Sequence, residues 1–169
     1  MDARPAQVVP LPSPLLGPSV WAPVAERLRH EGWPVDVCRL PTAPVSPRDV
    51  LAAFLEVLTP GRPVVLVPHS NAGLFPDAAT RLRVEEEQQR LPLAYFRDSL
   101  PAPAGWAHRP NAYLAFGDTY DEERRQAGVW QWPVETLDGE HLHLLVAPDD
   151  VATTVTALLA RLDVHPPGV

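Results

Sequence analysis

The side chains best suited to chemistry in this 169-residue chain fall in three segments, each just after an apolar run. In chain order they are Ser70, then Asp118 or Asp121, then His141 or His143. A serine hydroxyl at its free pKa is a poor nucleophile. It needs an imidazole to accept its proton and a carboxylate to orient that imidazole. The order serine, acid, histidine therefore predicts a nucleophilic triad.

Ser70 lies in a sequence typical of a tight turn between a strand and a helix. The four apolar residues 64–67 include three valines and predict a short buried strand. The turn then reads Pro-His-Ser-Asn-Ala, where a nucleophile elbow usually has glycine on both sides of the serine. Pro68 and Ala72 replace these glycines, although the fixed φ of proline suits the end of a strand. Considered alone, the segment is better explained as a buried strand that ends in a Ser/Asn turn.

The surrounding elements alternate between strands and helices. Strands are expected at residues 7–11, 33–40, 64–67, 112–116 and 133–137, and helices at residues 20–31, from 46 onward, 122–128 and 150–162. The helix that starts at Ser46 has Pro47 at its first position and should bury Leu51, Phe54, Leu55 and Leu58. This alternation predicts a parallel sheet flanked by helices, with all three candidate loops at the carboxyl edge of the sheet.

These segments together resemble the α/β-hydrolase superfamily, in particular its small bacterial members. The resemblance rests on residues 12–21, the turn at Ser70, the Gly117-Asp118 loop and residues 139–145, which are similar to the family's Gly-x-His loop. It covers most of residues 6–162 and implies a compact or truncated α/β-hydrolase fold that needs no cofactor. By the same match His141 is the base, and Asp118 is preferred over Asp121 because it follows its strand closely.

The resemblance also implies an oxyanion hole and a substrate pocket. One donor would be the N–H of Asn71, and the other would come from the loop after the first strand. Two prolines in that loop cannot donate, which leaves Leu15 as the candidate. The residues expected to line the pocket are Trp21, His69, Phe75, Tyr95, Phe96, Trp106 and His143.

The chain is shorter than ordinary members of the superfamily between the turn at Ser70 and the acid. Residues 74–110 contain no strand-like run, so they are expected to form a reduced cap on a single domain of residues 1–169. A missing central strand would leave an unpaired sheet edge, which a swapped element or a second subunit could fill. A homodimer is therefore one expected arrangement.

Composition excludes several classes of partner. The net charge is −7 and lysine is absent, which argues against nucleic acid and anionic membranes as partners. No apolar run of about 18 residues is present, so no membrane span is expected. The single cysteine, Cys38, fits a reducing, cytoplasmic compartment. The His141 and His143 pair lacks further ligands at metal-site spacing, so no metal is expected.

The sequence therefore predicts a serine hydrolase that acts on a small-molecule ester, thioester or lactone. Two alternatives remain open at this point. One is a non-hydrolytic cyclase, isomerase or lyase on the same fold, motivated by the altered turn and oxyanion loop. The other is a catalytically inactive protein that keeps the fold for binding.

Overall fold

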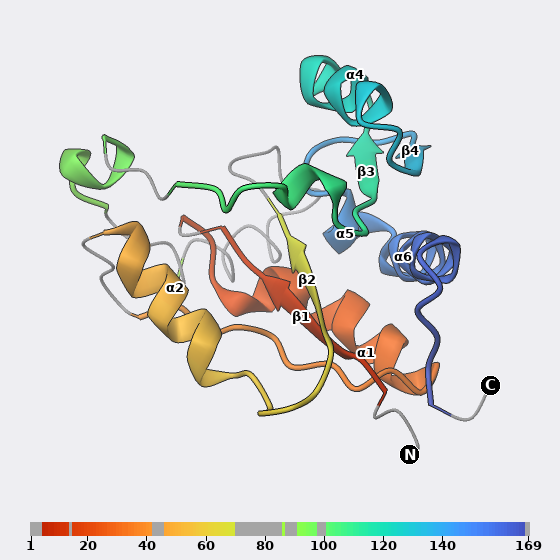
Figure 1. The fold of residues 1–169 in the computed structure, drawn as a ribbon, viewed down its shortest axis with the longest axis horizontal. Coiled ribbons are helices and arrows are strands. Elements are labelled where there is room, and N and C mark those ends of the chain that lie inside the picture. Colours follow the sequence, from red (N-terminus) through yellow and green to blue (C-terminus); the bar gives the residue numbers. More distant parts are fainter. Residues whose placement is uncertain are drawn as a thin grey trace.

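The structure is a computed structural model that describes residues 5–13, 15–41, 46–69, 86, 91–97 and 101–167. Within these ranges the protein is of the mixed α/β type, with five α-helices and two small parallel sheets (Figure 1). Three of the expected site residues, Ser70, Asn71 and Phe75, lie outside the described residues, as does much of the expected cap.

The first sheet pairs β1 (Gln7–Leu11) with β2 (Val64–Pro68) in parallel, as the sequence predicts. The prediction that this second strand is buried is wrong, because Val64 and Leu66 are 37 % and 43 % exposed. The strand expected at residues 33–40 is an extended segment that forms a single bridge, between Val8 and Val35. Its backbone follows β1, because Val8 N donates to the Pro34 carbonyl at 2.8 Å and Cys38 N donates to the Pro10 carbonyl at 2.9 Å. Pro10 has no N–H to return the next hydrogen bond, so the ladder is interrupted there.

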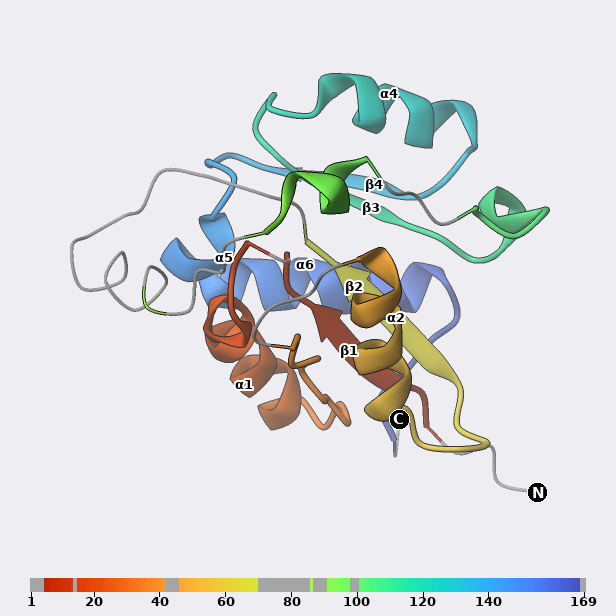
Figure 2. The same cartoon turned by 90° about the vertical axis from the view of Figure 1, so that its left-hand side faces the viewer.

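The second sheet pairs β3 (Tyr113–Phe116) with β4 (Val134–Leu137), also in parallel. The prediction of one continuous sheet is therefore wrong for the described residues, because no described strand joins β2 to β3. Figure 2 shows β3 and β4 beneath α4 (Asp121–Val129), while β1 and β2 lie with α1 (Ala22–His30) and α2 (Pro47–Glu56).

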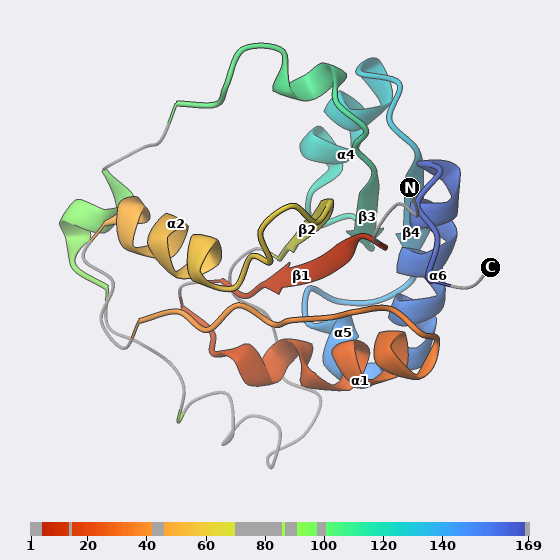
Figure 3. The same ribbon diagram turned by 60° about the horizontal axis from the view of Figure 1, so that its bottom comes forward.

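The main core lies where α1, α5 (His143–Val146) and α6 (Pro148–Arg161) meet (Figure 3). A 3₁₀ turn, η1 (Pro18–Trp21), precedes α1, so Ser19 lies inside this turn and does not cap the helix. The apolar faces of α1 and α6 point into this core, since Val24, Leu28 and Val151 are at most 1 % exposed. Within the part of the chain that is described, no helix is long and apolar enough to cross a membrane.

Helix α2 begins as predicted, but only part of the face expected to be buried contacts the core. Ser46 N donates to the Asp49 carboxylate at 2.8 Å, which caps the first turn. Leu51 and Leu55 are nevertheless 42 % and 55 % exposed, and the one fully buried residue of the helix is Ala53. Ala53 packs with Val9 of β1, and the partly buried Phe54 and Leu58 pack against the same cluster, so half of the expected face is confirmed.

Candidate active site

The loops after β2 and β4 lie next to each other although their strands belong to different sheets. His69 N donates to the Leu11 carbonyl at 3.1 Å, which extends the pairing of β2 with β1 by one residue. On the other sheet, Gly117 N donates to the Leu137 carbonyl at 2.9 Å. A hydrogen bond of 2.9 Å between His69 Nε2 and the His141 carbonyl then connects the two sides.

His69 lies at the centre of an aromatic group. Its ring centroid is 4.7 Å from that of His141 and 6.0 Å from that of Trp21, which meets it edge-on at 88°. Phe116, at the end of β3, is a further ring neighbour at 6.3 Å. Burial lowers the pKa of His69 to about 4, while its hydrogen bond to the His141 carbonyl opposes this effect. The ring is therefore neutral at pH 7.

The tautomer of His69 follows from its partner. A backbone carbonyl only accepts hydrogen bonds, so Nε2 of the neutral ring must carry the proton. Nδ1 is then an acceptor, and it is buried with no hydrogen-bond partner among the described residues. The indole N–H of Trp21 is likewise buried without a partner. Buried polar atoms of this kind are uncommon and often mark a functional site.

His141 is held by its neighbours in the sequence. The residue is 6 % exposed, and its ring lies 5.3 Å from that of Tyr120. Leu142 and Leu144 are buried in the main core, which fixes the loop on which His141 lies. The prediction that this loop precedes the last long helix is confirmed, since α5 and α6 follow it directly.

Two glycines allow the loops after β3 and β4 to approach each other. Gly117 has φ of +55°, and a Cβ added there would lie 2.8 Å from the Gly139 carbonyl oxygen. A Cβ on Gly139 would lie 2.6 Å from Cγ of His143. Since both distances are too short for real contacts, neither position accepts a side chain without rearrangement. The His143 ring thus packs on Gly139 and on Phe116, whose centroid is 5.8 Å away.

The two candidate acids differ in their surroundings. Asp121 begins α4 and forms an ion pair with Arg124, and its side chain is 59 % exposed. The hydrogen bond and charge of Asp121, and to a lesser extent the charge of Asp118, raise the pKa of Arg124. Within the described residues, neither carboxylate is hydrogen-bonded to the ring of His141. Asp118 stays the better candidate because it lies in the loop directly after β3 and has no ion-pair partner among the described residues.

The backbone N–H of Leu15, expected to stabilise an oxyanion, already has a partner. It donates to Oγ of Ser13 at 3.2 Å, and Leu16 N donates to the Ser13 carbonyl at 2.8 Å. Serine commonly closes local turns in this way. This geometry corrects the expectation that Leu15 offers an unengaged donor.

The aromatic residues expected to line one pocket are dispersed over the molecule. Tyr95 lies in the 3₁₀ turn η2 (Leu93–Phe96). Partial burial and, to a smaller extent, the negative charge of Asp49 on α2 raise the pKa of Tyr95. Trp106 is 39 % exposed and packs on Trp130 and Trp132, with centroids 5.2 and 5.5 Å away. Three of the expected pocket residues do belong to the aromatic group around His69, namely Trp21, His69 itself and His143.

Two members of this group, Phe116 and Tyr120, were missed at the sequence level. Phe116 is the last residue of β3, and Tyr120 lies in the same loop as Asp118. The signal was present, because side chains at the carboxyl end of a strand that carries a candidate acid tend to face the same site.

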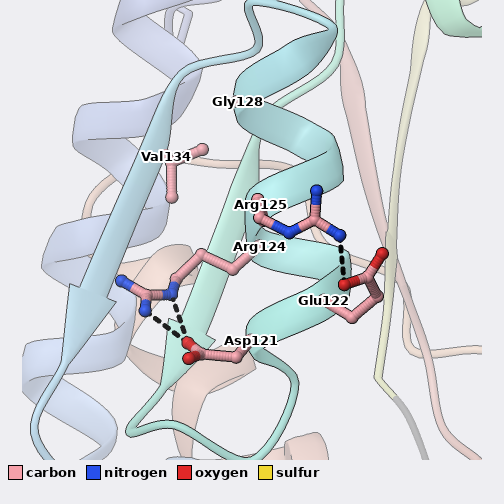
Figure 4. Close-up of a pocket in the computed structure, with 6 residues that line it drawn as sticks. All are labelled: Asp121, Glu122, Arg124, Arg125, Gly128 and Val134. Atoms are coloured by element: carbon pink, nitrogen blue, oxygen red, sulfur yellow. Dashed lines mark hydrogen bonds and ion pairs between the residues drawn. The ribbon is translucent and has the colours of Figure 1, made fainter.

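A surface depression of about 550 Å³ lies elsewhere, between α4 and β4 (Figure 4). Its lining consists of Asp121, Glu122, Arg124, Arg125, Gly128 and Val134. Two ion pairs, Asp121 with Arg124 and Glu122 with Arg125, run along its wall. None of the histidines takes part in this depression.

Neither a metal nor a known relative identifies the site. Among the residues that the structure describes, no group of three His, Cys, Asp or Glu side chains could hold a metal ion. No protein family, characterised protein or solved structure matches this chain.

Proposed function

We propose that the protein is a serine hydrolase that cleaves a small ester, thioester or lactone, with Ser70 as nucleophile and His141 as general base. One observation carries this proposal. His69, which directly precedes Ser70 in the chain, is hydrogen-bonded to the His141 backbone and contacts the His141 ring at 4.7 Å. His141, the candidate base, thus lies beside His69, and Ser70, the candidate nucleophile, is the next residue in the chain.

In the proposed reaction Ser70 Oγ attacks the substrate carbonyl while His141 accepts its proton. His141 then returns this proton to the leaving alcohol or thiol, and water releases the acyl group by the same steps. Asp118 is the proposed partner that orients His141, and the N–H of Asn71 is the proposed oxyanion donor. No step requires a cofactor.

The surroundings of His141 support a small substrate. The residue is 6 % exposed, and the neighbouring rings of Trp21, His69, Phe116 and Tyr120 present mostly apolar surface. A short acyl chain suits such surroundings better than a charged or large group does. The proposal also includes a cytoplasmic location, for which the lone buried thiol of Cys38 is the support.

The chain is in this proposal a shortened relative of the α/β-hydrolase superfamily. It keeps the order of serine, acid and histidine loops, and it carries them on two parallel sheets. The close approach of Gly117 and Gly139, which brings the acid and histidine loops together, supports this relationship.

Hydrolysis of p-nitrophenyl acetate and butyrate tests the proposed activity. Wild type should show turnover that Ser70→Ala reduces at least about 1,000-fold, since removal of a nucleophile usually costs more than that. Arg125→Ala, a change in the exposed ion pair with Glu122 on α4, is the control and should keep full activity. Equal turnover by wild type and Ser70→Ala would overturn the proposal.

A second function is favoured by the engaged N–H of Leu15. If only one oxyanion donor is available, an acyl-enzyme is less well stabilised, and a lyase, isomerase or cyclase that uses His141 as acid and base becomes the alternative. The two functions predict loss of activity in different variants. The alternative requires His141 but tolerates Ser70→Ala, and it predicts no turnover of p-nitrophenyl esters.

A further inference from the structure

We infer that His69 is a positioning residue. It holds the His141 loop against the end of β2 and so determines the position of the His141 ring, the proposed general base. The effect on catalysis rests on the proposed function, whereas the structural role does not. Within the described residues the two sheets share no strand pairing. The contact from His69 Nε2 to the His141 carbonyl, at 2.9 Å, therefore supplies a directed link where the sheet does not.

Both ends of this link are anchored. On one side the backbone of His69 is bonded to the Leu11 carbonyl of β1 at 3.1 Å. On the other side the loop of His141 is held by Leu142 and Leu144, which are 1 % and 0 % exposed. Because neither end can move far, one side-chain hydrogen bond is enough to fix the distance between the two loops.

The ring of His69 is confined as well. The edge of Trp21 meets it at 88°, and the His141 ring lies at 33° to it with centroids 4.7 Å apart. Within the described ranges Nδ1 is buried without a partner, so there the ring orientation satisfies only the bond to the His141 carbonyl. A ring placed for packing alone could turn over and leave Nε2 unpaired instead.

Three substitutions separate this role from simple packing. Glutamine places its amide nitrogen at the same number of bonds from the backbone as Nε2, so His69→Gln can still donate to the His141 carbonyl. Asparagine places its amide at the position of Nδ1, so the donor in His69→Asn is too far from the His141 carbonyl to form the hydrogen bond. His69→Phe keeps the ring volume and removes both nitrogens.

The first experiment compares kcat and KM of these variants on p-nitrophenyl butyrate. We expect His69→Phe and His69→Asn to lower kcat about 10- to 100-fold with KM changed less than about twofold, because a misplaced base slows the chemical step. His69→Gln should recover kcat to within about threefold of wild type. Equal loss in all three variants, or no loss in His69→Phe, would overturn the inference.

The second experiment does not depend on hydrolysis. In ¹³C,¹⁵N-labelled wild type at pH 7, NMR should show His69 protonated at Nε2. The carbonyl carbon signal of His141, which accepts the hydrogen bond, should shift in His69→Phe and His69→Asn and shift less in His69→Gln. Protonation at Nδ1 of wild type, or an unchanged His141 carbonyl signal in His69→Phe, would contradict the link. If wild type hydrolyses no ester but these signals behave as expected, the proposed function fails and the positioning role stands.

Discussion

The histidine cluster (His69, His141 and His143) and the depression beside α4 differ in burial and in the state of their charged and polar groups. The depression is hollow, and its charged side chains already neutralise each other in exposed ion pairs (Figure 4). The cluster is closely packed, but it holds a histidine whose pKa is lowered to about 4 and whose buried Nδ1 has no partner in the part of the chain that the structure describes. Perturbed and unsatisfied groups indicate chemistry better than volume does, so we place the site at the cluster.

The largest expected difference between the two regions is catalytic. His141→Gln removes the proposed base and should lower turnover of p-nitrophenyl butyrate by about 10⁴-fold, as loss of a triad member does. Asp121→Asn, in the depression, should lower turnover less than about twofold because its partner is the exposed Arg124. Turnover measured for both variants at pH 7 decides between the regions, and a larger loss in Asp121→Asn would reverse our assignment.

Glycine substitutions test packing in the same two places. Gly139→Ala should lower the free energy of unfolding by about 3 kcal/mol, since its Cβ would lie 2.6 Å from Cγ of His143. Gly128→Ala is the matched control in α4, where a Cβ meets nothing within 4 Å, and it should raise stability by about 0.5–1 kcal/mol. Urea denaturation measures both changes. Equal effects would show that the loop at Gly139 is not packed as described.

Acidification should destabilise the cluster through His69. Below pH 6.5 the unfolded chain binds a proton at this residue, whereas the folded chain does so only near pH 4. The unfolded state thus holds more protons, and stability falls as the pH falls. From pH 7 to pH 5 the loss from His69 is about 2 kcal/mol.

His69→Phe lacks this titrating group and serves as the comparison. Urea denaturation of both proteins at pH 7 and pH 5 isolates the effect, because the other titrating groups are common to both. The decrease in wild type should exceed that in His69→Phe. A parallel decrease would show that His69 is not buried as a neutral ring.

The smallest effect is expected at the ion pairs of the depression. Arg125→Ala removes the pair with Glu122, whose side chain is 72 % exposed, and exposed pairs contribute little to stability. The melting temperature should change by less than about 2 °C, and 0.5 M NaCl should not alter this result. A larger change would indicate that the depression is more than a solvated surface.

Local structure could be predicted from the sequence, whereas long-range pairing could not. The strand at β2 and the Ser46–Asp49 helix start are encoded by neighbouring residues, and both are confirmed. The burial expected for that strand is not found, since Val64 and Leu66 are 37 % and 43 % exposed. The division into two sheets depends on which strands meet across long segments, for which a local pattern holds no information.

The candidate site shows the same limit. The loops of His69 and His141 were expected to share one edge because they follow parallel strands, and they do lie together. Trp106 was expected nearby because it is aromatic, but apolar character does not specify a partner, and this residue packs on Trp130 and Trp132. The turn that engages Leu15 N–H was readable in principle, since serine two residues earlier favours such a bond.

Covalent labelling with a fluorophosphonate probe tests the central claim most directly. The account predicts that wild type gains one phosphonyl group, that the modified peptide contains Ser70, and that Ser70→Ala gains none. His141→Gln should be labelled at least about 100-fold more slowly, because the nucleophile then lacks its base. Absence of labelling in wild type, or undiminished labelling of Ser70→Ala, would contradict the assignment of this protein as a serine hydrolase.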